Sequence, residues 1–209
     1  MGSYPYAAGL FPLGGKQGEK VEVTFFGGTL PAPVKSTIVP DAKAFSWVAL
    51  PGSASAPFLF ASSDLPELLE PSQPVSVPSV VNGRLLVQGE VDRYRFPVQP
   101  GESLLFEIQA RELGSSRLEA VLTVFDASGK KLDSAGDKPL PEDVFAVQGT
   151  SRTSNDPFLN FTVPAGVNEI TVAVEDLARR GGPNYGYRDR KSTRLNSSHS
   201  AKSRMPSSA

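Results

Sequence analysis

Short stretches in which apolar and polar residues alternate recur along the first 188 residues and predict β-strands. The clearest is Ser103–Gln109, where Leu104, Phe106 and Ile108 fall on one face. Turn-forming Gly, Pro, Asn and Asp residues separate the stretches, and no helical period lies between them. The sequence therefore predicts an all-β chain built as antiparallel β-sandwiches or a jelly roll. The other expected strands are Lys20–Phe26, Val34–Val39, Phe45–Leu50, Pro57–Ala61, Arg84–Gly89, Val91–Val98, Leu118–Phe125, Phe158–Val163, Glu169–Val174 and the start of a last strand at Tyr185–Arg188.

The Pro-rich segment Asp64–Asn82 is the best candidate for a domain boundary. It contains four prolines and little charge after Glu70. Proline lacks an N–H for a sheet and restrains the residue before it to extended geometry. We therefore expect a semi-stiff linker at residues 64–82, between a small β-sandwich-like domain at residues 1–63 and a larger one at residues 83–188. The acidic stretch Leu132–Asp156 is expected to be an exposed loop of the larger domain.

The last 21 residues differ in composition from the rest of the chain. Asp189–Ala209 contains seven serines, five basic residues and one acid, with no hydrophobic period, which predicts a disordered tail. Asp189–His199 and Ser203–Ala209 resemble one reading frame of a sequencing-adapter oligonucleotide, so residues 189–209 are interpreted as an artefactual tail. On this interpretation the natural protein continues differently after Arg188. The last strand is then truncated and leaves an open sheet edge.

Composition and charge exclude several classes of function. Among 209 residues there is no cysteine, which excludes disulfides, thiolate nucleophiles and Cys-ligated zinc. The one histidine, His199, falls in the tail, so residues 1–188 cannot hold a Ser-His triad. The net charge of −1 argues against a nucleic-acid binder, and no apolar run is long enough to span a membrane. Met1–Tyr4 shows no feature of a signal peptide.

Carboxylates near the ends of the predicted strands are the candidates for a metal site. Calcium takes roughly six to eight oxygen ligands, which loop carboxylates at one end of a sandwich can supply. Because the chain has no D-x-D-x-D-G spacing, we expect a solvated acidic loop, with a calcium site as the alternative and no other cofactor. The candidate ligands are Asp137, Asp156 and Asp176, with Asp143 and Glu175 as neighbours.

The remaining charged candidates are expected to serve the structure. Asp92 opens a strand beside a turn, where a carboxylate accepts backbone N–H groups; the alternative role is a metal ligand. Arg111 and the pair Arg179–Arg180 flank turns. We expect Arg111 to form a structural salt bridge with Asp176 or Glu175 rather than to recognise a ligand.

Aromatic residues and glycines offer two further candidate sites. Trp47, with Phe45 two residues before it, is either a core residue or an aromatic platform for a glycan or peptide, and a lone tryptophan in a short β domain favours the core. Tyr185 and Tyr187 share one strand face and are expected to pack. Gly14–Gly18 lacks the spacing of a phosphate-binding loop, and no helix follows it, so it predicts a turn.

Two parts of the chain carry motifs in the order seen in known families. In the second half they are Gly83 to Gly89, Asp92–Phe96, Pro100–Glu102, Ala110–Ser115, Leu118–Asp126 with Gly129, Asp156–Phe158, Val163–Gly166, Val174–Asp176 and Gly181–Arg188. In this order they resemble the bacterial pre-peptidase C-terminal domain, a β-sandwich similar to the binding domains that follow secreted collagenases. In residues 4–62, Phe11–Gly18, a strand and then Gly27–Gly28 resemble an Ig-like module of the transcription-factor-Ig type.

The resemblance implies a function without catalysis, because the family accompanies peptidases and other secreted enzymes and performs no chemistry itself. We expect an accessory, binding or spacer module of a secreted or cell-surface bacterial protein, and therefore an extracytoplasmic location. The alternatives are the non-catalytic part of a secreted peptidase or carbohydrate-active enzyme, and a calcium-dependent binding module. The expected partners are neighbouring domains of a parent chain and a protein or polysaccharide ligand, with no nucleic acid and no membrane span.

Overall fold

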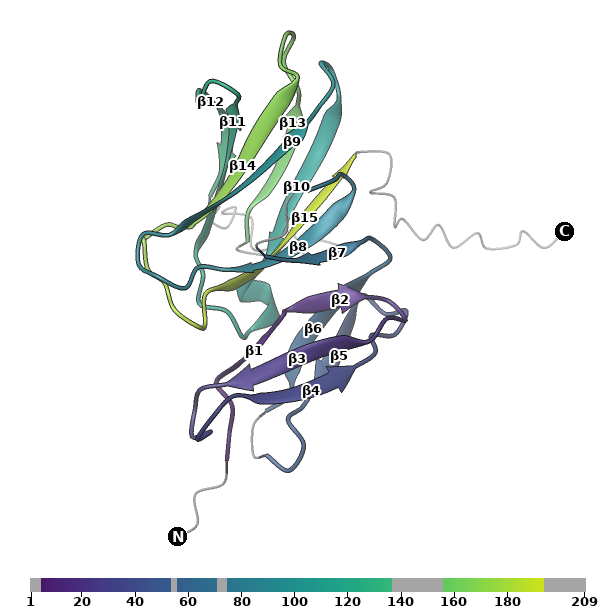
Figure 1. Ribbon diagram of the computed structural model, residues 1–209, viewed down its shortest axis with the longest axis vertical. Helices are drawn as coiled ribbons and strands as arrows, with labels where there is room; N and C mark the ends of the chain where they lie inside the picture. Colours follow the sequence, from purple (N-terminus) through teal and green to yellow (C-terminus); the bar gives the residue numbers. More distant parts are fainter. Residues whose placement is uncertain (1–4, 54–55, 71–74, 137–155, 194–209) are drawn as a thin grey trace, which may run out of the picture.

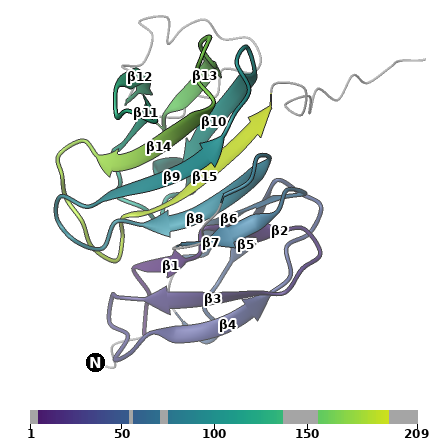
Figure 2. The same cartoon turned by 45° about the horizontal axis from the view of Figure 1, so that its top comes forward.

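The computed structural model describes residues 5–53, 56–70, 75–136 and 156–193 and confirms an almost all-β protein (Figure 1). These residues form fifteen strands and one short 3₁₀ turn, and they contain no α-helix. No helix in this part of the chain could cross a membrane. Strands β1 to β6 form a small unit, here called the N-terminal module, and β7 to β15 form a larger one, here called the sandwich. Figure 2 places the module against β7 and β8 of the sandwich.

The N-terminal module consists of two three-stranded sheets that enclose a small core. One sheet has the antiparallel order β1-β3-β4, and the other has the order β2-β6-β5, with β2 parallel to β6. Val23, Phe25 and Phe60 meet between them and are fully buried. The strands are β1 (Gly9–Phe11), β2 (Gly14–Lys16), β3 (Val21–Phe26), β4 (Val34–Ile38), β5 (Phe45–Val48) and β6 (Phe58–Ser63).

The sandwich consists of a five-stranded sheet, β13-β10-β15-β8-β7, and a four-stranded sheet, β12-β11-β14-β9. All pairs are antiparallel except β7 with β8. A 3₁₀ turn, η1 (Arg111–Leu113), follows β10. The strands are β7 (Glu67–Leu69), β8 (Ser79–Arg84), β9 (Val91–Pro97), β10 (Ser103–Gln109), β11 (Ala120–Asp126), β12 (Lys131–Ala135), β13 (Phe158–Thr162), β14 (Glu169–Asp176) and β15 (Gly186–Thr193).

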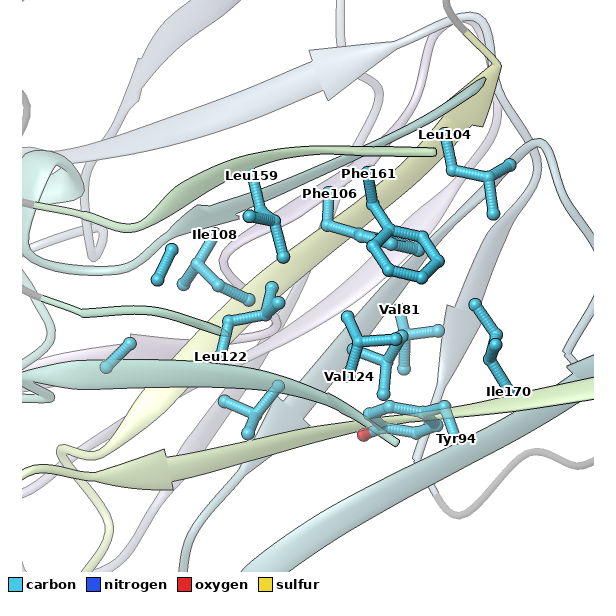
Figure 3. Close-up of a cluster of buried hydrophobic side chains, with 14 of the residues drawn as sticks. Val81, Tyr94, Leu104, Phe106, Ile108, Leu122, Val124, Leu159, Phe161 and Ile170 are labelled. Carbon is cyan, nitrogen blue, oxygen red and sulfur yellow. The ribbon is translucent and has the colours of Figure 1, made fainter. Parts of the chain in front are cut away.

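The core of the sandwich follows from the predicted alternation. On β10, Leu104, Phe106 and Ile108 are buried between the sheets, and Figure 3 shows them facing side chains from the opposite sheet. The Phe106 ring lies 6.2 Å from the Phe96 ring and 6.3 Å from the Phe161 ring, centroid to centroid. These tilted pairs join three strands in one packed layer. The same alternation turns every second residue of β10 to the opposite face of its sheet.

The Pro-rich segment is not the linker that its composition predicts. Glu67–Leu69 forms β7 and residues from Ser79 onward form β8, and the two pair in parallel. Pro66 and Pro78 stand just before these strands, where the missing proline N–H costs the sheet nothing. The strand expected at Arg84–Gly89 ends at Arg84, and β8 extends backwards into the segment instead. The segment is therefore part of the sandwich.

The disorder expected from Asp189 onward is corrected for residues 189–193, and so is the open sheet edge beside the last strand. Strand β15 continues to Thr193 and lies between β10 and β8, so no open edge remains at this place. The physical reason is that both neighbouring strands present backbone N–H and C=O groups, which any residue except proline can satisfy. The tail from residue 194 onward, with His199, lies outside the described residues, as do Asp137 and Asp143.

Candidate functional site

A groove of about 590 Å³ lies between the N-terminal module and the sandwich. One wall is the outer face of the five-stranded sheet, where alternation places Leu105, Glu107 and Gln109 of β10. Phe158 and Asn160 of β13 continue this wall and are exposed. The module contributes residues of β5, β6 and the loops beside them, so the groove exists only where the two units meet. We call it the junction groove.

Beside this groove, the side chain of Arg188 binds residues of both units. Its side chain is only 3% exposed and forms an ion pair with Glu67. Its Nη1 donates to Gln109 Oε1 at 2.6 Å, and its Nη2 donates to Ser63 Oγ at 3.0 Å. Since Ser63 belongs to the module and the other partners to the sandwich, one guanidinium joins β6, β7, β10 and β15.

The network continues from Arg188 into the module through side-chain amides. Glu67 Oε2 accepts a hydrogen bond from Asn82 Nδ2 at 2.7 Å, and Asn82 Oδ1 accepts one from the Gly14 backbone N–H at 3.2 Å. A Cβ at Gly14 would lie 2.5 Å from Arg188 Nε and 2.6 Å from the Ala61 carbonyl oxygen. Only glycine allows this approach, which explains one of the glycines in the Gly14–Gly18 motif. That motif begins as strand β2 and turns at Gly18, where φ is 73°.

Apolar and cation–π contacts extend the junction on either side of the network. The Arg84 guanidinium lies 4.6 Å from the centre of the Phe11 ring, and burial lowers the Arg84 pKa. Leu13 and Ala61 of the module pack with Leu113 of η1 in a small buried cluster. The module is therefore docked on the sandwich by packing as well as by polar contacts.

A second hollow, of about 290 Å³, contains Trp47, which lies two residues along β5 from Phe45 of the junction groove. Trp47 was expected in the core, but 71% of it is exposed. The reason is its strand: β5 is the edge of its sheet, and Val48, not Trp47, packs against the module core. Phe45, on the same face two residues earlier, packs against the cluster of Leu13, Ala61 and Leu113.

The two calcium candidates that the structure describes, Asp156 and Asp176, both accept hydrogen bonds from backbone N–H groups. Asp156 accepts hydrogen bonds from the N–H groups of Ala110, Arg111 and Glu112, and so holds η1 in place. Burial raises the Asp156 pKa although these bonds act to lower it. Asp176 accepts bonds from the N–H groups of three other residues: Glu119, Ala178 and Arg180.

Arginine side chains pair with the carboxylates near Asp176. Arg180 donates from Nε to Asp176 at 2.9 Å and from Nη2 to Glu119 at 2.8 Å. Burial acts to raise the Asp176 pKa, but the hydrogen bonds from Arg180 and Glu119 and the charge of Arg180 together outweigh it, and the pKa is lowered. Arg111 pairs with Glu119 at 3.4 Å, and Arg179 pairs with Glu175 at 3.8 Å. The expected structural salt bridge of Arg111 thus has Glu119, not Asp176 or Glu175, as its partner here.

Asp92 belongs to a buried cluster that the sequence did not indicate. It lies on β9, where the Tyr187 hydroxyl donates to Asp92 Oδ2 at 2.5 Å. The two hydroxyls of Tyr94 and Tyr187 are 2.5 Å apart, and the Tyr94 hydroxyl donates to Glu70 at 3.1 Å. While Asp92 is ionised and accepts from Tyr187, the two tyrosines have no hydrogen left for their own contact. A protonated Asp92 can donate to the Tyr187 hydroxyl, which then donates to Tyr94, and the chain is complete. Burial raises the Asp92 pKa to about 7 in agreement with this arrangement.

The described residues contain no group of three or more His, Cys, Asp or Glu side chains that could hold a metal ion. Tyr187 is fully buried in the sandwich core, and the partly buried Tyr185 packs against that core.

Reasoning from the sequence missed the junction groove, because its residues come from both units. The local signal was the pair Phe45 and Trp47, of which Phe45 lines the junction groove and Trp47 the second hollow.

No protein-family model matches this chain, and no curated protein matches it. Among solved structures, it is similar to the pre-peptidase C-terminal domain of collagenase from Bacillus anthracis, with 11% sequence identity and a TM-score of 0.39. The similarity covers 61% of this chain and 95% of that one. At this identity and TM-score it carries no functional conclusion.

Proposed function

We propose that this chain is a non-catalytic binding and spacer unit of a larger secreted or cell-surface bacterial protein, and that its ligand binds in the junction groove. The function is accessory: the sandwich and the docked module present a fixed surface, and catalysis belongs to other domains of the parent protein. The motif order in residues 83–188, which resembles the pre-peptidase C-terminal domain, supports this proposal and the extracytoplasmic location that goes with it.

The observation that carries the proposal is how the polar residues at the junction are used. Arg188, Glu67 and Asn82 bind one another and the module, and they leave an open groove of about 590 Å³ beside them. A catalytic site needs a nucleophile or a proton-transfer group held ready beside the substrate. The chain contains no cysteine and its one histidine is His199. A hollow lined by apolar side chains together with a few rigidly held polar groups is instead the arrangement of a binding site.

A turnover assay on the full chain tests the proposal. We expect no hydrolysis of casein, p-nitrophenyl esters or p-nitrophenyl glycosides above the buffer rate. Glu107→Gln removes a carboxylate from the groove wall, and Glu169→Gln, on β14 of the opposite sheet, is its matched control. Turnover that survives purification and is lost in Glu107→Gln but not in Glu169→Gln would contradict the proposal.

We also propose that the residues after Arg188 are foreign to this fold, as the resemblance to a translated adapter implies. Asp189 and Lys191 support this, because both are fully buried on the core side of β15 and pair with each other. Their register partners on β10 are Ile108 and Phe106, which are core residues. Asp189 Oδ1 has no hydrogen-bond partner within the described chain. Sequencing the source genome across codon 188 tests this: an uninterrupted native reading frame through these codons would reject it.

A further inference from the structure

Strand β5 contributes a residue to each of two hollows of different chemistry. Phe45 lines the junction groove, and Trp47 lines the second hollow of about 290 Å³. Residues two apart on a strand project from the same face, about 7 Å from each other. The two hollows are therefore consecutive along one face of β5 and lie where one extended ligand can occupy both.

From this arrangement we propose that the junction binds a neutral polysaccharide chain, with one sugar ring stacked on Trp47 and neighbouring rings bound by polar side chains of the junction groove. The inference rests on the proposed binding function and adds to it the class of ligand and the residue that anchors it.

The exposure of Trp47 is the first argument. With 71% of its surface exposed, it is the most exposed large apolar side chain among the described residues. Its wide ring is flat and apolar, and its indole N–H is a hydrogen-bond donor at the edge. Pro57, Leu59 and Leu113 border the same hollow and leave the ring accessible from one side. A pyranose ring, apolar on its faces and polar around its rim, matches this surface.

The polar side chains of the junction groove are the second argument. Gln109 and Asn160 lie on the sheet wall, and Gln17 lies on the module wall. Ser62 also lies on the module wall, but its hydroxyl donates to a backbone carbonyl and can only accept from a ligand. Amides can donate and accept at once, as sugar hydroxyls do. Gln109 is held rigid because its Oε1 accepts from Arg188, which leaves its amide hydrogens for a ligand. Asn160 is exposed on β13.

The charges around the groove favour a neutral ligand over an acidic one. Arg188 is paired with Glu67, and Arg190, which belongs to the segment proposed to be foreign, is paired with Glu107 at 3.5 Å. Each guanidinium on the wall thus has a carboxylate beside it, so the groove offers no uncompensated cation to a uronic acid or a sulfated chain. Without Arg190 the wall would keep the Glu107 carboxylate and have one cation fewer. The remaining carboxylate on the wall, Asp64, would repel such a ligand.

Affinity electrophoresis of the full chain in gels that contain one soluble polymer tests the inference. The neutral polymers are mixed-linkage β-glucan, xyloglucan and galactomannan; polygalacturonate and gelatin represent acidic polysaccharides and polypeptides. We expect at least one neutral polymer to retard the protein and Trp47→Ala to raise the dissociation constant about tenfold or more. Trp47→Phe should retain part of the affinity, and Asn160→Ala should weaken binding through the other hollow.

Leu177→Ala is the matched control, because Leu177 is 59% exposed on a turn of the sandwich that contributes to neither hollow. It should leave retardation unchanged, and circular dichroism should confirm that every variant is folded. Retardation by gelatin or polygalacturonate alone, no retardation in any gel, or retardation that Trp47→Ala leaves intact would each overturn the inference. Release of reducing ends from a bound polymer would instead refute the non-catalytic function, so the two failures are distinguishable.

Discussion

The two units of this protein differ in how much of their stability they can provide for themselves. Among the described residues, the sandwich buries a cluster of 22 apolar side chains between its sheets, whereas the core cluster of the N-terminal module has six. A unit of about 60 residues buries too little surface to be more than marginally stable. The module gains further stability from its contact with the sandwich, where Leu13 and Ala61 pack with Leu113 and where Arg188 binds Ser63. A small domain can thus be held as a rigid partner by a larger one.

Phe106→Ala should have the largest effect, because this ring is fully buried and contacts rings from β9 and β13. We expect a loss of about 3–5 kcal/mol in the free energy of unfolding. Amide hydrogen exchange should lose protection in both units, since β10 also carries the Gln109 contact to Arg188. In contrast, Phe25→Ala should expose amides of the module while those of β10, β11 and β14 stay protected. Equal loss in both units from Phe25→Ala would mean that they unfold as one.

Arg188→Met should separate the two units. It leaves Glu67 buried without its cation, and breaking a buried pair in this way costs about 3 kcal/mol or more. The Arg188→Met and Phe106→Ala proteins should be compared under conditions that give them the same free energy of unfolding. The amides of the module should then exchange faster in Arg188→Met than in Phe106→Ala. Arg95→Ala is the control: the Arg95–Glu169 pair is mostly exposed, so its loss should cost less than about 1 kcal/mol. An equal loss in the free energy of unfolding from both substitutions would show that Arg188 does not hold the module on the sandwich.

The core side of β15 provides the opposite test, in which stability should rise. Replacing both Asp189 and Lys191 by valine removes a fully buried ion pair and adds β-branched side chains to the core. Such replacements are often stabilising by about 1–4 kcal/mol, whereas changing one partner alone should destabilise strongly. The urea midpoint measures both effects. A double variant less stable than the parent would show that the pair belongs to this core.

The pH dependence of stability should reside in the sandwich. The Asp92 pKa is raised to about 7 from 3.8, so the folded state holds a proton that the unfolded chain releases. This contribution is fully present below about pH 4 and is lost as the pH rises to about 7. The full difference between the two pKa values corresponds to about 4 kcal/mol, which solvent screening of a partly accessible carboxyl reduces to about 2 kcal/mol. In Asp92→Asn the amide supplies the missing hydrogen to Tyr187 at every pH, so the decline should flatten.

Other charged groups surround Asp92, and they are the same in the parent protein and in Asp92→Asn. Glu70 and Glu90 raise its pKa further, Lys191 lies over the Tyr94 ring, and Asp189 is close to Tyr94. These groups remain in Asp92→Asn, so the difference between the two pH profiles measures Asp92 itself. An unchanged profile in the variant would remove Asp92 as the source. In the module, the exposed Asp41 has a lowered pKa, chiefly through its backbone hydrogen bond from Lys43, and should not contribute a decline of this kind.

Calcium should have the smallest effect, with the same melting temperature in excess calcium and in a chelator. Asp156 and Asp176 already accept three backbone hydrogen bonds each, and Arg180 lies against Asp176. A site filled at 100 times its dissociation constant would add about 2.7 kcal/mol, which a thermal melt detects readily. A calcium-dependent rise in the melting temperature would restore the calcium-dependent module as a function.

Most strands could be predicted from the sequence, because alternation indicates both a strand and its buried face. Ser103–Gln109 has the bounds that its pattern predicts. The missed strands β1, β2 and β7 have three residues each, too few for a period to be recognised. Strand β12, Lys131–Ala135, was also missed, and it corrects the loop expected from Leu132 for its first four residues. Trp47 was misplaced because alternation says which residues share a face but not whether another sheet covers that face.

The candidate site could not be predicted for a different reason. Arg188 contacts Gln109, Glu67 and Ser63, which lie 79, 121 and 125 residues away in the sequence. No local pattern records such contacts, because they arise from the order of strands in a sheet and from the docking of one unit on another. The acidic residues, which local patterns do reveal, turned out to serve turns and strand ends.

The position of β15 also affects how the protein is made. In the five-stranded sheet this strand lies between β10 and β8, both of which precede it in the chain. A ribosome releases residues from the N-terminus onward, so the sheet first exists as two separate halves. Each half presents an unpaired row of backbone groups to other nascent chains until residues 186–193 emerge. Synthesis therefore includes an interval in which aggregation is most favoured, and the arrival of a single late segment ends it.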